Sequence, residues 1–412
     1  MNSALGRVAA RARADLWQPL PGPATETPLE RSGRRSPTWS RLLERLRWPF
    51  FVYAGSRLLL LVVALVNGVL QHSPLLTELT NWDGIWYIRL AEHGYPKTVV
   101  HAQTTLGFLP LYPMLMWLVS HILFCGAAVA GLIISGVGGL VATVLVERLA
   151  ESWWGREGAR RAVLFFCFFP GSVVFSMVYS EGVLIPLVAG CLIALQHRRW
   201  LVAGLLAASA TAVGPNGVPI IVVCAFAALF ELRRRGWRDT TAWRSLLAPL
   251  LAPVGLIAFG LFLWTWTGSP FASLVAQRDG WGERTDALAL FRQGKTLASE
   301  ISFTHFNFHL VNLNLVIGLL GVIVLVAGLV QLLQRPRQVS FEARVWAFGI
   351  AVLTVTSEFV PPNPRVLITG FPLLLVIAQR LSRRGFNMLL ATSTLLLVIL
   401  SAITYVGIAL RP

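Results

Sequence analysis

Charged residues are scarce in this chain, and cysteine is nearly absent. Only 13% of the 412 residues are charged, whereas 55% are hydrophobic, which is more apolar side chain than a soluble domain can bury. The four cysteines lie singly, inside or beside apolar runs, with no CxxC or Cys/His spacing, so neither a disulfide framework nor a cysteine metal site is expected. The composition predicts an all-α polytopic membrane protein.

The first 48 residues lack the apolar stretch of a signal peptide or membrane span. They contain nine arginines and several prolines, with little hydrophobic periodicity. We therefore expect residues 1–48 to form a disordered basic cytoplasmic arm and residues 49–412 to form a single transmembrane domain.

Eleven apolar runs approach the roughly 20 residues that a helical membrane span needs. Several are short and end in tight breaks such as YSE and GPNG, so some neighbouring pairs could be broken helices. The expected spans cover about 49–70, 126–147, 162–178, 182–196, 200–213, 216–231, 246–267, 310–333, 343–359, 365–380 and 387–409.

The net charge of +16 could suggest a nucleic-acid partner, but its placement indicates membrane topology instead. With the N-terminus inside, 26 of the 35 basic residues fall in cytoplasmic segments, as the positive-inside rule requires. We expect a multi-pass plasma (inner) membrane protein with no nucleic-acid partner and its unusual polar residues on the outer face. The bilayer's anionic lipids could attract the basic segments.

The first outer loop, 71–125, contains an aspartate in NWDGIWYIRLAEHGYP. Apolar spacing over 82–94 predicts a helix along the membrane surface, which Asn81 or Asp83 could cap and Gly94 could end. Asp83 is thus either a helix cap, a catalytic carboxylate, or both. The apolar piece at 107–123 is expected to be a second interfacial or re-entrant helix, although a true span is the alternative.

The order of several motifs resembles that of one enzyme family. WDGIWYIRLAEHGYP, FLPLYP at 108–113 and FFPGSVVFSMVYSEGVL at 168–184 are similar to successive motifs of the phosphatidylinositol-glycan class V (PIG-V) type mannosyltransferases, which belong to the GT-C glycosyltransferases. NPRVLITGFPLLL at 363–375 resembles a late segment of the family. In ATAVGPNGV, Gly214 stands where the family often has a basic residue, which weakens a phosphate-binding role there.

The resemblance implies a GT-C-like membrane enzyme that transfers mannose from a polyprenyl monophosphate on the outer face, with inversion and with Asp83 as the general base. Arg365 is the first choice as the ligand of the departing phosphate, ahead of Lys97, Arg278, Arg284 and His305. The expected substrate-binding residues are Trp82, Arg89, His93, Tyr112, Tyr179, Glu181, Asn216, Glu358, Asn363 and Arg365.

Several assignments remain open from the sequence. Glu181 could cap a helix or bind sugar or His93, Glu358 could pair with Arg365 or bind substrate, and Asn216 could be a turn residue. No cofactor is required, although a divalent metal at Asp279, Glu283 or Asp286 is an alternative.

The acceptor could be a glycolipid, a lipoglycan or a protein, and the outer loop 268–309 is the expected acceptor region. The alternative functions are a transporter or flippase of lipid-linked sugars and a non-catalytic membrane assembly partner.

Overall fold

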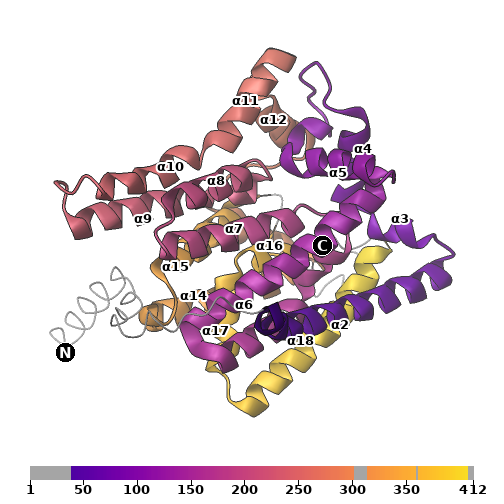
Figure 1. Cartoon of the computed structure of the whole chain (residues 1–412). Helices are drawn as coiled ribbons and strands as arrows, with labels where there is room; N and C mark the ends of the chain where they lie inside the picture. The colour runs from indigo at the N-terminus through magenta and orange to yellow at the C-terminus, as the bar shows by residue number, and fades with distance from the viewer. Residues whose placement is uncertain (1–38, 301–312, 359–360, 407–412) are drawn as a thin grey trace.

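The computed structural model describes residues 39–300, 313–358 and 361–406. These residues form helices joined by turns, and their one β contact is an isolated bridge between Thr285 and Ser357 (Figure 1). The predicted all-α fold is therefore confirmed. His305, Asn307 and His309, together with residues 1–38 of the predicted arm, lie outside the described residues.

The longer helices are α2 (Trp39–Gln71), α4 (Asp83–His93), α5 (Leu111–Ile122), α6 (Ala127–Phe168), α7 (Glu181–Gln196), α8 (Trp200–Thr211), α9 (Pro219–Arg235), α11 (Val254–Thr267), α13 (Ala289–Glu300), α14 (Leu313–Gln334), α15 (Phe341–Thr356), α17 (Phe371–Arg380) and α18 (Arg383–Tyr405). The short ones are α3 (Leu75–Leu79), α10 (Leu247–Leu251), α12 (Ala272–Val275), α16 (Pro364–Thr369) and the turns η2 (Thr105–Gly107), η3 (Pro170–Ser176), η4 (Pro215–Gly217), η5 (Ala242–Leu246), η6 (Ala276–Gly280) and η8 (Pro336–Gln338).

Six of the described helical segments are long and apolar enough to cross a membrane, or seven with the bent pair η3 and α7. The predicted count of eleven is not confirmed. Two expected spans, 200–213 and 365–380, instead contain the shorter apolar helices α8 and α17. Apolar helices of 10–17 residues extend roughly 15–26 Å at 1.5 Å per residue and fall short of a 30 Å hydrocarbon core. Helix α5 is also a shorter apolar helix, with 12 residues, which favours the predicted interfacial or re-entrant helix at 107–123 over a true span.

Three of the predicted boundaries differ from the structure. Helix α2 begins at Trp39, so residues 39–48 are helical and do not belong to a disordered arm. The expected spans 126–147 and 162–178 are joined in α6 across a break at Gly155, whose φ of 69° suits glycine. The second of these spans ends at Phe168, because Pro170 starts the 3-10 turn η3 in its place.

The packed centre of the molecule is formed by α6, which contacts α2, α5, α7, α17, α18 and η3. Phe166, Phe175 and Phe371 are fully buried there. Helices α8, α9 and α10 pack together on one side, whereas α2 and α18 lie along each other on another (Figure 1).

The arginine-rich helix ends contact neighbouring helices and loops. Arg161 donates a hydrogen bond to the carbonyl of Leu381, Arg380 bonds Gln334, and Arg198 lies 3.6 Å from Glu231. Helices α7 and α16–α17 run from these ends to Glu181 and Arg365 at their other ends. The packing therefore separates the basic helix ends from the polar residues singled out in the sequence.

Arg57 lies within the first candidate span and anchors η3 to α2. Its guanidinium donates to the carbonyl of Ser172 at 2.6 Å, to the hydroxyl of Ser176 at 2.9 Å and to the carbonyl of Cys167 at 3.2 Å. A charge at such a depth is costly unless its donors are satisfied. The same bonds fix the segment that leads from α6 to Tyr179 and Glu181.

The separation of helix ends predicts which loops face the cell exterior. In a Cys125→Ser background, we expect Thr98→Cys to react with a membrane-impermeant thiol reagent in intact spheroplasts. Thr240→Cys, also exposed but beside the arginines of α9, should react only after permeabilisation. The opposite labelling pattern would place the Asp83 side in the cytoplasm.

Candidate active site

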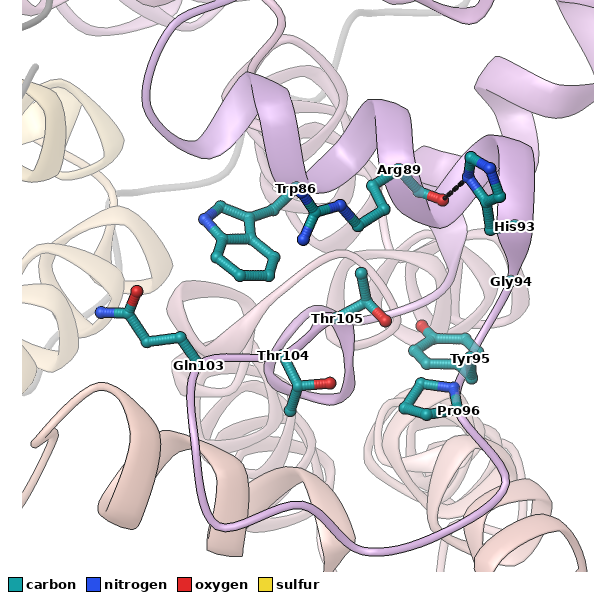
Figure 2. Close-up of a pocket in the computed structure, with 9 residues that line it drawn as sticks. All are labelled: Trp86, Arg89, His93, Gly94, Tyr95, Pro96, Gln103, Thr104 and Thr105. Atoms are coloured by element: carbon teal, nitrogen blue, oxygen red, sulfur yellow. Dashed lines mark hydrogen bonds between the residues drawn. The ribbon is translucent and has the colours of Figure 1, made fainter.

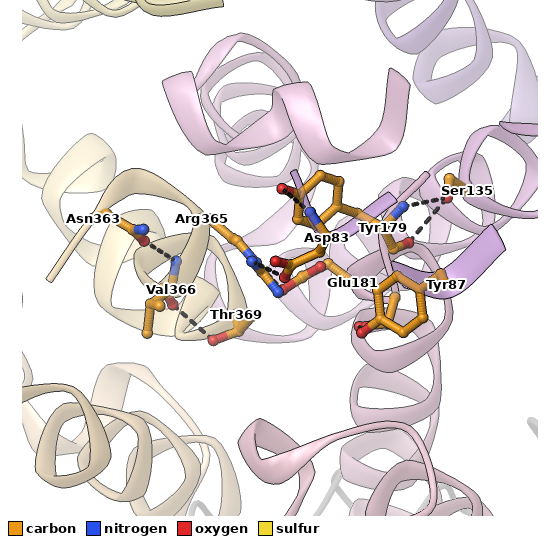
Figure 3. A network of polar contacts seen from close by, with 10 residues as sticks. Asp83, Tyr87, Ser135, Tyr179, Glu181, Asn363, Arg365, Val366 and Thr369 are labelled. Carbon is orange, nitrogen blue, oxygen red and sulfur yellow. Dashed lines mark hydrogen bonds and ion pairs between the residues drawn. The ribbon is translucent and has the colours of Figure 1, made fainter. Parts of the chain in front are cut away.

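One arginine joins two carboxylates from distant parts of the chain (Figure 3). The Nη1 of Arg365 lies 2.6 Å from Oδ2 of Asp83, and its Nε lies 2.6 Å from Oε1 of Glu181. Asp83 begins α4, Glu181 begins α7 and Arg365 is in α16. The structure thus brings together the predicted catalytic residue and two predicted substrate-binding residues.

Tyr179 packs against both Arg365 and Asp83. The guanidinium carbon of Arg365 lies 4.5 Å from the centre of the Tyr179 ring, and the Tyr179 hydroxyl accepts the backbone N–H of Asp83 at 3.3 Å. Ser135 holds Tyr179 in turn, because its Oγ donates to the Tyr179 carbonyl at 2.9 Å. Tyr179 is fully buried, so it provides a fixed support for Arg365 and Asp83.

The tyrosine nearest to Asp83 on α4 stays neutral. The Tyr87 hydroxyl donates to Ser180 Oγ at 2.9 Å. Burial raises the pKa of Tyr87, and the negative charge of Asp83 raises it further. Tyr87 is therefore protonated at neutral pH and does not compete with Asp83 as a proton acceptor.

The turn before Asp83 is held by the C-terminal end of α18. Trp82 has a φ of 64°, an unfavourable value for a bulky residue. Its Nε1 donates to the carbonyl of Thr404 at 3.1 Å, and the Asn81 side chain donates to the carbonyl of Tyr405 at 2.8 Å. Both carbonyls belong to the last turn of α18, where carbonyls have no partner within the helix. These bonds compensate for the strained turn.

The prediction that Asn81 or Asp83 caps α4 is wrong. The N-cap position is Trp82, and no side chain caps the helix start. Asn81 bonds α18, and the Asp83 carboxylate bonds Arg365. Likewise, no side chain caps α7, because Glu181 bonds Arg365.

Close backbone contacts place Glu181 and Arg365. A Cβ on Gly138 would lie 1.9 Å from the carbonyl oxygen of Gly182, so the start of α7 touches α6. A Cβ on Gly171 would lie 2.0 Å from the carbonyl oxygen of Pro364, which sets α16 against η3. Asn363 precedes Arg365 by two residues. As the N-cap of α16, its side-chain oxygen accepts the N–H of Val366 at 2.9 Å.

The three charged side chains differ in exposure. The Glu181 side chain is 2% exposed, and its Oε2 has no hydrogen-bond partner among the described residues. The side chains of Arg365 and Asp83 are 20% and 26% exposed. Oδ1 of Asp83 makes no hydrogen bond within the described part of the chain, so it can accept a proton from an incoming hydroxyl group.

The ion pairs give Arg365 a role that the sequence did not suggest. Its guanidinium already balances one of two negative charges, so the trio has a net charge of −1. Arg365 therefore orients Asp83 and compensates the buried Glu181. Its predicted contact with the phosphate of a lipid-linked donor stays a prediction.

Arg89 and His93 line a separate cavity of about 450 Å³ beside α4 (Figure 2). The Arg89 guanidinium lies 4.9 Å from the Trp86 ring centre, and Nδ1 of His93 lies 3.3 Å from the Arg89 carbonyl oxygen. Neither side chain contacts Asp83. The proposed bond between His93 and Glu181 is not formed, because Glu181 bonds Arg365.

Four other predicted substrate-binding residues contact other parts of the protein or lie in a turn. Tyr112 is fully buried and bonds Gly131 and Ser135. Asn216 lies half-buried in the turn η4. Glu358 lies 3.4 Å from Arg292, so the predicted pair with Arg365 is wrong: the bridge at Thr285–Ser357 holds Glu358 beside α13. Trp82 donates its indole N–H to α18.

The acidic residues considered for a metal do not converge. Asp279 lies 2.6 Å from Arg278 and 2.7 Å from His101, and both contacts lower the pKa of Asp279. Asp286 bonds Arg292, and Glu283 accepts a bond from Ser357. No group of three or more His, Cys, Asp or Glu side chains that could hold a metal is found in the described ranges.

The remaining phosphate candidates are dispersed. Lys97 lies 5.5 Å from the Trp266 ring centre, and Arg284 is exposed in the loop before α13. His305 lies outside the described residues. Ser135 was not predicted, because its only signal in the sequence is its place in the small-residue run SGVGG at 135–139, and the anchoring role of Arg57 was not predicted either.

Comparison with known families supports the motif assignment. The model of the family described as Mannosyltransferase (PIG-V) matches residues 59–258, slightly under half of the chain. The predicted resemblance is confirmed over this range, and the match supports the predicted glycosyltransferase class. Asp83, Tyr179 and Glu181 lie inside the matched range, whereas Arg365 lies beyond it. No curated protein sequence matches the chain at a significant level.

Several solved structures are similar. ArnT from Cupriavidus metallidurans bound to undecaprenyl phosphate is 16% identical with a TM-score of 0.47, over 81% of this chain and 62% of ArnT. The apo oligosaccharyltransferase of Archaeoglobus fulgidus is 13% identical with a TM-score of 0.46, over 89% of this chain and 56% of the enzyme. The chain thus spans less than two thirds of the length of these proteins.

The dependence of Glu181 on Arg365 can be measured. We expect Arg365→Met to lower the free energy of unfolding by about 3–5 kcal/mol, because it leaves a buried carboxylate without a counter-charge. Adding Glu181→Gln should restore part of the loss, as read from thermal unfolding in detergent. Equal melting temperatures for the single and double variants would contradict this coupling.

Proposed function

We propose that this chain is a membrane glycosyltransferase, specifically an inverting mannosyltransferase that uses a polyprenyl-monophosphate-linked mannose donor on the outer face of the membrane. The observation that best supports the proposal is the position of Asp83. This partly exposed carboxylate is fixed by Arg365 and Tyr179 at helix ends remote from the arginine-rich ends. The match of residues 59–258 to a mannosyltransferase family supports the same class.

The reaction requires a base at this place. An acceptor hydroxyl attacks the anomeric carbon of the donor sugar, its proton passes to Oδ1 of Asp83, and the bond to the lipid phosphate breaks with its electron pair on the phosphate. Inversion follows from a single displacement. The ion pair to Arg365 holds Asp83 in one orientation, so its geometry is set before the acceptor arrives. A metal ion is not part of this proposal.

An apolar groove beside the site suits the hydrocarbon tail of a lipid-linked donor. The groove encloses about 640 Å³ between α5, α6, α7 and α8, and its lining is almost wholly apolar, including Val137, Val141, Gly182, Val183, Pro186 and Leu206. Gly182 directly follows Glu181, so the groove begins next to the ion-paired group. A polyprenyl chain lying there would place its phosphate close to Asp83.

Helix lengths agree with a site near the outer membrane boundary. Glu181 is separated from the arginine-rich end by the 16 residues of α7, or about 24 Å, most of the roughly 30 Å hydrocarbon core. A charged sugar phosphate could approach there without entering the apolar interior. The positive-inside distribution of arginines supports the outer face.

The proposed base is tested by Asp83→Asn. In membranes supplied with radiolabelled polyprenyl-phosphate mannose, we expect the variant to lose about 100-fold or more of the transfer rate, because the amide cannot accept the proton. Asp279→Asn, at an exposed acid of the same side, should keep the rate. Undiminished transfer by Asp83→Asn would refute the assigned role, and no transfer by the parent would refute the proposed donor.

Donor chain length tests the groove. We expect Val141→Trp to raise KM several-fold for a long polyprenyl-phosphate mannose and to change KM little for a short-chain analogue. Val330→Trp, on α14 and similarly exposed at 43% against 44%, serves as the control. Identical effects of Val141→Trp on both donors would show that the tail lies elsewhere.

A further inference from the structure

The cavity beside α4 differs in character from the Asp83 group. Its lining includes Trp86, Arg89, His93, Gln103, Thr104 and Thr105 (Figure 2). Trp86, Arg89 and His93 follow one another at spacings of three and four residues, which places them on one face of the helix. Two positions that can carry positive charge therefore border the cavity, and no carboxylate does.

Aromatic contacts hold Arg89 in place. Its guanidinium carbon lies 4.9 Å from the centre of the Trp86 ring. Trp86 itself is packed against Phe108, with ring centres 6.3 Å apart, and against Trp281, with ring centres 5.2 Å apart. The guanidinium is thus positioned by a cation–π contact, which leaves its N–H donors available.

The charge of Arg89 is not balanced by any carboxylate of the described residues. Three other arginines on this side differ in that respect. Arg278 pairs with Asp279, Arg292 with Asp286 and Arg365 with Asp83 and Glu181. The pocket around Arg89 is therefore attractive to an anion.

Two threonine hydroxyl groups add further donors. Thr104 and Thr105 are 8% and 5% exposed, and their hydroxyls form no hydrogen bond to any residue that the structure describes. In Figure 2 they lie between Trp86 and Tyr95. Both hydroxyls are open to the cavity that they line, so each can donate to an acceptor oxygen of a ligand there.

We propose that this cavity binds a phosphate-bearing sugar headgroup, and that the headgroup belongs to the acceptor. The phosphate oxygens would accept from Arg89 and the threonine hydroxyls, and the sugar hydroxyls would meet Gln103 and His93. The assignment to the acceptor rests on the proposed function. It makes the acceptor an anionic glycolipid in place of a neutral glycan or a protein side chain.

Position along α4 favours the acceptor over the donor. Arg89 is six residues from Asp83, about 9 Å along the helix axis, and lies more than 90° around it. The donor phosphate is bonded to the anomeric carbon, so it must lie close to Asp83 during transfer. A phosphate at Arg89 is too remote to be the leaving group, whereas an extended acceptor can reach both places.

Binding of mannose 6-phosphate to the full-length protein in a neutral, non-sugar detergent tests the proposal by calorimetry. We expect the parent to bind it and to bind methyl α-mannoside far more weakly. Arg89→Gln should raise the Kd roughly 10- to 100-fold, as loss of a charge-assisted hydrogen bond implies. Thr104→Val should raise the Kd less. Arg233→Gln, at an exposed arginine of α9 outside the cavity, is the matched control and should leave the Kd unchanged.

The outcomes separate this proposal from the proposed function. Asp83→Asn should bind mannose 6-phosphate like the parent even though it cannot transfer mannose. If the parent binds mannose 6-phosphate, Arg89→Gln weakens that binding and the parent transfers no mannose, the phosphate site stands and only the proposed enzyme activity is refuted. Equal Kd values for the parent and Arg89→Gln would overturn the site. Competitive displacement by undecaprenyl phosphate would assign the cavity to the donor and overturn the acceptor assignment.

Discussion

The site depends on one constraint: a nearly buried carboxylate in a membrane protein needs a compensating charge. Glu181 is 2% exposed, and Arg365 supplies that charge while its other nitrogen binds Asp83. Breaking such a pair is costly because the surviving charge cannot be solvated. The need to compensate Glu181 therefore fixes the orientation of Asp83 as well, and it ties α4, α7 and α16 to a common point.

The surrounding packing serves the same arrangement. Arg57 fixes η3 through backbone carbonyls, and Gly138 and Gly171 allow the starts of α7 and α16 to approach their neighbours closely. The last turn of α18 holds the strained Trp82. Each contact joins segments distant in sequence, so the group is rigid before substrate binds. Preorganisation of this kind is what a proton-accepting carboxylate requires.

The proposed roles of the apolar groove, the Asp83 group and the Arg89 cavity follow from their charge and polarity. The apolar groove that begins at Gly182 suits a hydrocarbon tail, the Asp83 group has a net negative charge that suits proton removal, and the Arg89 cavity attracts an anion. Separating the two kinds of charge along α4 would keep an acceptor phosphate away from the carboxylates while its hydroxyl reaches Asp83. The geometry thereby supports a lipid-linked donor and an anionic acceptor.

The sequence by itself determined the helical membrane class, and it predicted the one-sided distribution of arginine and singled out Asp83 as a candidate, because composition, charge placement and local motifs are properties of the linear chain. It did not determine the number of spans, since α7, α8 and α17 are apolar but short, and it wrongly assigned Asp83 as a possible cap and Arg365 as the partner of Glu358. Only the tertiary structure decided that Arg365 joins Asp83 to Glu181 across 282 and 184 residues. Ion pairs at such separations arise from helix packing, which no local pattern encodes.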